Sequence, residues 1–157
     1  MQTLKEIAEF IADGRPFEAH HRRLRSLLSS KAIVPTIEGG APTGSLFDNL
    51  EAARARLGVR LLEVGISSLE AAFIIARTTR DDNWAEVAAD PWMWEMYVSH
   101  VRNAHGIIET YGEINELGTR QGYELPPVLK DNRYEPYDEP KTLAVTNIDL
   151  SDIFYDA

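Results

Sequence analysis

Arginine and histidine side chains are concentrated between residues 15 and 31, in the segment RPFEAHHRRLRSLLSSK. An arginine guanidinium can bind a phosphate through two parallel hydrogen bonds, and it can read the edge of a guanine in the same way. A helix that presents such groups on one face while its other face packs is suited to binding nucleic acid. The candidate contacts in this segment are Arg15, His21, Arg22, Arg25 and Lys31.

A glycine-rich loop follows this segment and is the second candidate for contact with nucleic acid. Residues 32–37 read as a short strand, residues 38–44 as a turn-rich loop and residues 45–47 as a returning strand, which together predict a small hairpin or wing. Gly39 and Gly40 would allow the backbone to approach a phosphate closely. The loop has no basic residue to hold that phosphate in place.

Other chemically capable residues have simpler structural interpretations. Arg54, Arg56 and Arg60 form a second basic group, but their spacing spreads them around a helix. His105 and Glu109 are four apart and could ligate a metal, although a hydrogen bond within a helix explains them better. Three tryptophans, Trp84, Trp92 and Trp94, could line an aromatic pocket or serve as core or interface anchors.

Catalytic chemistry has little support in the sequence. The chain contains no cysteine, which excludes disulfides, thiolate metal sites and a cysteine nucleophile. It also lacks a phosphate-binding loop, a serine-hydrolase elbow and a dinucleotide fingerprint. We therefore expect a protein that is not an enzyme and has no catalytic residue, resident metal or cofactor.

The first half of the chain reads as four helices. Residues 3–12 place apolar side chains on one face, with Thr3 and Glu6 in the capping-box pattern. Residues 16–31 follow, with an apolar stripe that includes Leu24 and Leu27. A third helix is expected from Asp48 or Asn49 to Gly65, and a fourth after Ser67 or Ser68. The residues expected to be buried on this fourth helix are Leu69, Ala72, Phe73 and Ala76.

The second half is expected to contain one long helix followed by extended chain. Residues 80–91 read as a polar junction with a short helix at most, and residues 91–118 as a long helix suited to pairing with a second subunit. The proline-rich segment 123–141 should be extended or loop-like. The tail after it is either a docking strand or a mobile segment that orders on a partner. The predicted dimer-interface residues are Met93, Tyr97, Val101, Ala104 and Ile108.

Charge is unevenly distributed along the 157 residues. Residues 1–80 hold 11 Lys/Arg and 9 Asp/Glu, whereas residues 81–157 hold 5 Lys/Arg and 16 Asp/Glu, and the whole chain has a net charge of −9. The asymmetry indicates segments with different roles, although a solvated acidic region would explain it equally. The start shows no signal-peptide pattern, and no apolar run is long enough to span a membrane. We therefore expect a cytoplasmic location.

The order of these elements resembles the winged helix-turn-helix domain of the MerR family over residues 3–77. The segment LKEIAEFI is similar to the family's first helix, and HHRRLRSLLSSKAIVP to its recognition helix and exit. GGAPTGSLFDNLEAARAR is similar to the wing and the following helix start, and RLLEVGISSLEAAFII to the family's helix pair. The chain departs from the family in lacking the arginine of the wing, where Ser45 and Leu46 stand, and in its longer first turn. The remaining half is similar to no effector domain.

The resemblance over the first half and the residue patterns of the second half together predict a mainly α fold with a small β-hairpin wing and a long helix, followed by an extended acidic C-terminal segment. They divide the chain into a winged helix-turn-helix domain (1–80), a helical dimerisation or interaction region (81–122) and an acidic tail (123–157). The function that the resemblance implies is a transcriptional regulator that binds double-stranded DNA as a homodimer. The alternative is a protein-interaction module, such as a phage-type accessory or inhibitor, that docks its acidic second half on a basic partner.

Overall fold

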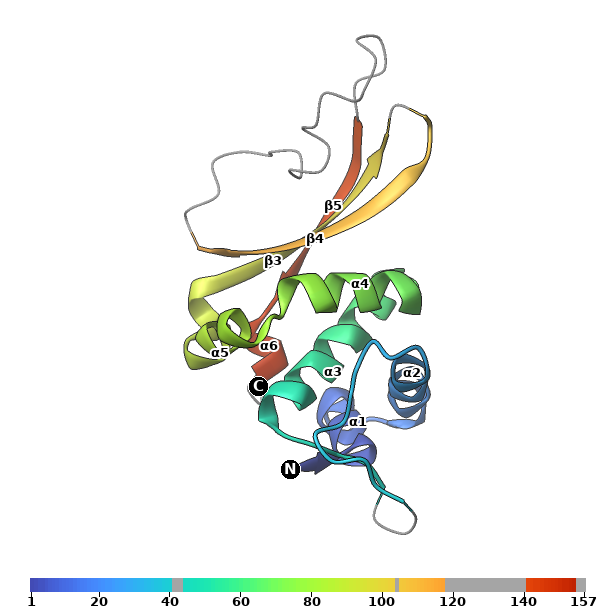
Figure 1. Ribbon diagram of the computed structural model, residues 1–157, viewed down its shortest axis with the longest axis vertical. Helices are drawn as coiled ribbons and strands as arrows, with labels where there is room; N and C mark the ends of the chain where they lie inside the picture. The colour runs from blue at the N-terminus through green and yellow to red at the C-terminus, as the bar shows by residue number, and fades with distance from the viewer. Residues whose placement is uncertain (41–43, 104, 118–140, 155–157) are drawn as a thin grey trace. The chain divides into compact units, whose positions relative to one another are not determined.

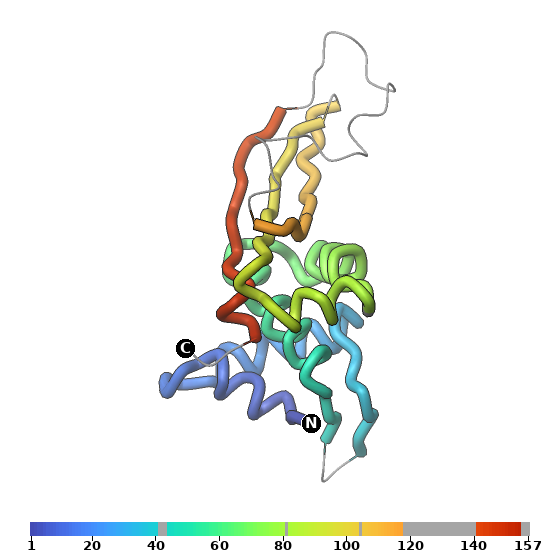
Figure 2. Tube along the Cα trace, turned by 90° about the vertical axis from the view of Figure 1, so that its left-hand side faces the viewer, coloured from blue at the N-terminus to red at the C-terminus, as the bar shows by residue number. Residues whose placement is uncertain are grey.

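The computed structural model describes residues 1–40, 44–103, 105–117 and 141–154 (Figures 1 and 2). The chain forms two compact units. The first, here called the helical unit, comprises Met1–Ala89 together with Ser151–Ala157, and the second, the sheet unit, comprises Asp90–Leu150. Of the described residues, 49% are helical and 25% are in strands. The prediction of a mainly α fold is therefore wrong, and the protein is mixed α/β.

The helical unit contains most of the first half of the chain (Figure 1). Helices α1, α2 and α3 pack together, and α3 also packs on α4, α5 and α6. The core between them is formed by fully buried side chains such as Ile7, Leu24, Leu27, Leu57 and Leu61. The elements in chain order are β1 (Gln2–Thr3), α1 (Leu4–Ala12), α2 (Glu18–Ser29), β2 (Leu46–Phe47), α3 (Asn49–Glu63), α4 (Ser68–Thr78), α5 (Asp81–Ala89) and α6 (Ser151–Phe154).

Local capping signals fix where three of these helices begin. Thr3 caps α1 in a capping box with Glu6, and Ser67 caps α4 in the same way. The Asp48 side chain caps α3 by accepting a hydrogen bond from a backbone N–H of its first turn. The backbone N–H of Thr3, which donates to the Glu6 carboxylate, is the main reason that the pKa of Glu6 lies below its ordinary value. These helix starts confirm the sequence predictions.

The predicted wing is only partly formed as a hairpin. Its returning strand is present as β2, but β2 pairs antiparallel with β1 at the start of the chain. The expected outgoing strand at 32–37 contributes a single bridge, between Ile37 and Leu46. Ala32 and Ile33 are instead buried directly after α2, and Pro35 has no N–H to donate to a strand ladder.

The fourth helix buries a different face from the one expected. Its fully or nearly buried residues are Ala71, Ile74, Ile75 and Thr78. Leu69 and Phe73, which the sequence placed in the core, are 65% and 71% exposed. The sequence did not distinguish the two faces, because α4 is apolar on both sides.

The sheet unit replaces the long helix predicted for 91–118. A short 3-10 helix (η1, Pro91–Met93) leads into β3 (Trp94–Arg102), which is followed by β4 (Ile108–Glu116) and later by β5 (Lys141–Asp149). The three strands form an antiparallel sheet in the order β4-β3-β5. Of the two alternatives for the tail, the structure has the docking strand, because 141–149 is β5 and pairs with β3.

A tight turn explains why the helix prediction failed. The Asn103 side chain accepts hydrogen bonds from the backbone N–H groups of His105 and Ile107, and Gly106 adopts a positive φ of 78°. This turn reverses the chain between β3 and β4. The residues predicted to form one helical seam are therefore separated: Met93 lies in η1, Tyr97 and Val101 in β3 and Ile108 in β4. Ala104 lies outside the described residues.

The proline-rich segment predicted to be extended falls mostly within residues 118–140, outside the described residues. Among the residues that the structure describes, no helix has the length and apolar character that crossing a membrane requires.

Candidate nucleic-acid interface

The outward face of α2 carries two of the predicted contact residues. Leu24 and Leu27 are fully buried on the inner side of the helix, and Arg22 and Arg25 are exposed. Ser26, which is also exposed, lies four residues from Arg22 on the same face. Across the described ranges, no ion pair involves either arginine. Both guanidinium groups therefore keep their donors available for a binding partner.

The end of α2 holds a further exposed cation in an unusual backbone conformation. Lys31 has a φ of 58°, in the left-handed region that favours glycine. Its N–H donates to the Leu28 carbonyl, and the N–H of Ala32 donates to the Leu27 carbonyl at 2.9 Å. These two bonds form a Schellman motif, which ends the helix. A lysine here supports the helix dipole with its charge, although a glycine would fit the backbone better.

Other basic residues of α2 are committed to the helical unit. Glu63, at the end of α3, lies 3.3 Å from a guanidinium nitrogen of Arg23 and 3.5 Å from Nδ1 of His20. The same carboxylate pairs with Arg60 at 3.1 Å. The sequence did not single out Glu63, because its partners on α2 lie about forty residues away in the chain. This cluster joins α2 to α3.

The remaining residues predicted to contact nucleic acid differ in how exposed they are. Arg15 is exposed in the turn before α2, whereas His21 is half-buried with its ring edge against Phe17. Gly39 and Gly40 are exposed in the loop before β2. A Cβ on Gly39 would lie 1.6 Å from the Gly44 carbonyl oxygen, so glycine is required there to close the loop. Gly40 has open space around it.

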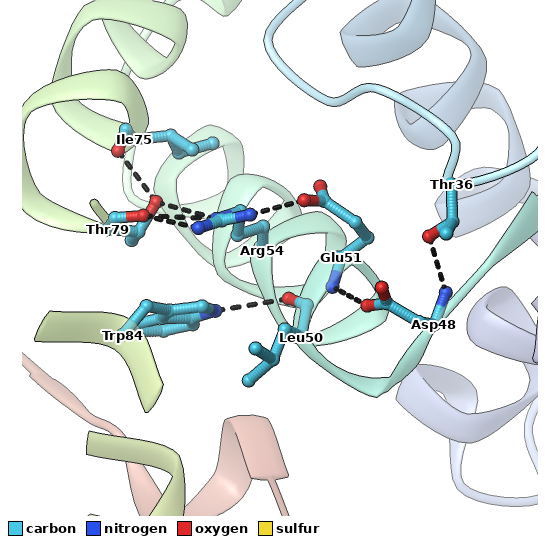
Figure 3. Close-up of polar contacts among 8 residues, drawn as sticks. All are labelled: Thr36, Asp48, Leu50, Glu51, Arg54, Ile75, Thr79 and Trp84. Carbon is cyan, nitrogen blue, oxygen red and sulfur yellow. Dashed lines mark hydrogen bonds and ion pairs between the residues drawn. The ribbon is translucent and has the colours of Figure 1, made fainter. Parts of the chain in front are cut away.

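The arginines of α3, which formed the second basic group, all have partners inside the helical unit. Figure 3 shows Arg54 reaching the end of α4, where its Nη2 donates to the Thr79 carbonyl at 2.6 Å, and also pairing with Glu51. The first turn of α3 makes two further contacts (Figure 3). Asp48 caps it, and its Leu50 carbonyl accepts a hydrogen bond of 3.1 Å from the indole N–H of Trp84.

Arg56 is the most enclosed of the three and is only 6% exposed. Its Nη1 donates to the Ile153 carbonyl at 2.9 Å, and its Nη2 donates to Oε1 of Gln2 at 2.8 Å. The guanidinium carbon lies 3.7 Å from the centre of the Phe10 ring. Arg56 thus connects α3 to both ends of the chain. Arg60, in addition to its pair with Glu63, lies 3.9 Å from Asp152.

Two hollows are alternative candidate sites. One, of about 450 Å³ in the helical unit, is lined by both signs of charge, including Arg15, Arg60, Glu63 and Asp152. The other, of about 320 Å³ in the sheet unit, is lined by Trp92 and Trp94 together with Glu95 and Asp149. Trp84 does not lie beside these two tryptophans in the hollow. It is fully buried, and its ring centroid is 4.8 Å from that of Phe154.

The candidate metal ligands form no metal-binding cluster among the described residues. His105 is exposed in the turn after β3, and the Glu109 carboxylate accepts a hydrogen bond from the Tyr111 hydroxyl at 2.7 Å. His100 lies on β3 beside Thr110. The part of the chain that the structure describes contains no group of three or more metal-ligating side chains.

The outward face of α2, flanked by Arg15 and Lys31, is thus the best candidate for an interface with a polyanion. Comparison with protein-family models, with curated proteins and with solved structures finds no match to this chain.

Proposed function

We propose that the protein is a transcriptional regulator of the MerR-like type that binds double-stranded DNA through α2. The observation that carries the proposal is the exposed pair Arg22 and Arg25, whose guanidinium groups form no ion pair within the described residues. Every other arginine of α2 and α3 is held by a carboxylate or a carbonyl inside the helical unit. Among the described residues, α2 and α3 thus leave two guanidinium groups for external anions.

The order of elements supports the same proposal. A first helix, a second helix with an exposed basic face, the short strand β2 and two further helices follow one another along the helical unit. This is the order that the resemblance to a winged helix-turn-helix implies, with α2 as the recognition helix. The loop before β2 contains Glu38 and no basic residue, so we expect it to contribute little to DNA affinity.

The test is fluorescence anisotropy of the purified protein titrated against the duplex that flanks its own gene and against a random duplex, at several salt concentrations. We expect preference for the flanking duplex and an affinity that falls steeply with salt, because bound phosphates release counterions. The double variant Arg22→Ala/Arg25→Ala should lose most of the affinity. A matched control, Lys5→Ala/Arg102→Ala, removes the same charge from other exposed positions and should lose little. No binding at low salt would refute the proposal.

A second candidate function is docking on a basic protein partner through the sheet unit. The strand register places Glu95, Glu109, Glu113 and Asp149 on one face of the sheet. Such a face resembles a row of phosphates in charge and would suit a basic groove. Recovery of one stoichiometric basic partner in a pull-down, lost when these residues are changed to glutamine, would favour this function over DNA binding.

A further inference from the structure

Helix α4 has an exposed apolar stripe in addition to its buried face. Leu69 and Phe73 are 65% and 71% exposed, and Ala76 is exposed on the same side. A helix that is apolar on all sides is typically buried on all sides, yet within the described residues only one face of α4 is covered. Large exposed apolar side chains that share one face mark an interaction surface.

The spacing of this stripe is that of a helix-pairing seam. Leu69, Phe73 and Ala76 follow one another at intervals of four and three residues within α4, which keeps them along one narrow line. Glu70 and Arg77 flank the line on the same side, because they are seven residues apart. The seam thus has an apolar centre with a negative charge near its first turn and a positive charge near its last.

We infer that this seam pairs antiparallel with the same seam of a second copy of the chain, about a two-fold axis. In that arrangement the Phe73 ring of each copy packs against Ala76 of the other, and Leu69 of each copy lies toward the C-terminal end of the other copy's α4. Glu70 of each copy lies beside Arg77 of the other, so the interface gains two opposite-charge pairs. A parallel two-fold pair would place the two Glu70 side chains on opposite sides of the seam, and likewise the two Arg77 side chains, so it would gain neither opposite-charge pair, and it would align the two helix dipoles.

The sheet edges are poorer surfaces for self-association. A two-fold pairing of β4 edges would bring Glu109, Glu113 and Glu116 of both copies together, which like-charge repulsion opposes. The β5 edge contains a register shift opposite His100 and Val101, which interrupts a regular strand ladder. Of these three surfaces among the described residues, the α4 seam is the one whose charges complement those of its own copy.

The pairing supplies what the proposed function requires, because a dimer presents two copies of α2 to a pseudo-palindromic site. It takes the role that the sequence assigned to a helix at 91–118. The two proposals are tested separately, since self-association is measured without DNA.

The first measurement is sedimentation equilibrium of the full chain over a range of concentrations. We expect a monomer–dimer equilibrium, and we expect Phe73→Glu to raise the dimer dissociation constant at least about tenfold by burying a charge in the seam. The matched control is Ile108→Glu, which places the same charge at a position that is 58% exposed in the sheet unit. It should leave the dissociation constant unchanged.

The second measurement tests the orientation. Arg77→Glu should weaken the dimer by placing glutamates of the two copies together, and adding Glu70→Arg in the same chain should restore it. Because Glu70 also caps α4, thermal unfolding of each variant separates loss of the cap from loss of the interface. In this cysteine-free chain, Ala76→Cys should cross-link between copies with a short bis-maleimide, and Ala19→Cys on α2 should not.

Three outcomes would overturn the inference. The protein is monomeric at every concentration; it dimerises equally well with Phe73→Glu; or the charge reversal fails to restore a dimer whose fold is intact. A dimer that binds no DNA would leave the inference standing and refute only the proposed function.

Discussion

The arginines of α2 and those of α3 differ in what their guanidinium groups contact. Arg22 and Arg25 on α2 are exposed and form no ion pair among the described residues. Arg54, Arg56 and Arg60 on α3 donate to carbonyls or pair with carboxylates of the helical unit. Two neighbouring helices thus use the same side chain for different purposes. On α3 it holds elements together, and at Arg22 and Arg25 of α2 it remains available.

The comparison shows that basic composition alone does not identify a binding surface. Residues 1–80 contain 11 Lys/Arg, but many of those in α2 and α3 are satisfied within the chain. A surface for a polyanion needs cations whose donors have no internal partner, because only these gain by neutralising phosphate. The two sets of arginines should therefore separate stability from binding when they are changed.

The largest expected effect is on stability, from Arg56→Met. This change removes two charge-assisted hydrogen bonds and leaves the Ile153 carbonyl and the Gln2 side chain without their donor. We expect a loss of about 3 kcal/mol in the free energy of unfolding. Urea unfolding followed by circular dichroism measures it, with Arg22→Met as the control on an exposed site. Equal losses from both variants would contradict the distinction between the two helices.

The next effect is on binding, from Arg22→Ala/Arg25→Ala. With two guanidinium groups gone from each copy of α2, we expect roughly 10- to 100-fold weaker DNA binding and a salt dependence whose slope falls by about two for each copy that contacts the duplex. The free energy of unfolding should change by less than about 0.5 kcal/mol, because neither side chain is buried. Anisotropy and urea unfolding on the same preparations check both. Unchanged affinity together with an unchanged salt slope would remove α2 from the interface.

The sequence predicted which arginines of α2 are exposed, but it did not predict the internal partners of the α3 arginines. The exposed position of Arg22 and Arg25 follows from the helical period, because Leu24 and Leu27 fix the inner face. The helix starts at Thr3, Asp48 and Ser67 were equally predictable, since a cap and its bond lie within one turn. The partners of the α3 arginines were not predictable. Arg56 bonds to Ile153, 97 residues away, and no local pattern encodes such a contact.

The sheet unit shows a different limit. Met93, Tyr97, Val101 and Ile108 recur at helical steps, yet the segment 94–102 also alternates, with Met96 and Val98 buried. Short apolar runs often fit both periods, and the turn at Asn103 and Gly106 decides between them. On α4 the sequence predicted the helix correctly but not which of its two apolar faces is buried. The stripe at Leu69 and Phe73 was predicted to be buried, and the structure leaves it exposed.

A smaller effect is expected from Lys31→Gly, a single change that should alter both the free energy of unfolding and the affinity for DNA. Glycine adopts the left-handed conformation without the steric cost that Lys31 has at φ 58°. The free energy of unfolding should therefore rise by about 1 kcal/mol. DNA affinity should fall about threefold, because one exposed cation at the end of α2 is lost. A variant that is more stable and binds DNA as well as the parent would exclude Lys31 from the interface.

The smallest effect should come from Arg23→Ala, which sharpens the comparison within a single helix. Arg23 lies beside Arg22 in the sequence, but its guanidinium is 3.3 Å from the Glu63 carboxylate and its side chain is only 38% exposed. Since Glu63 keeps its contact with Arg60, the loss of stability should be about 0.5 kcal/mol. DNA affinity should change by less than about twofold, well below the loss from Arg22→Ala, because the removed charge was already neutralised. Equal losses of affinity from Arg23→Ala and Arg22→Ala would mean that any cation on α2 serves, and that availability does not decide which arginine binds.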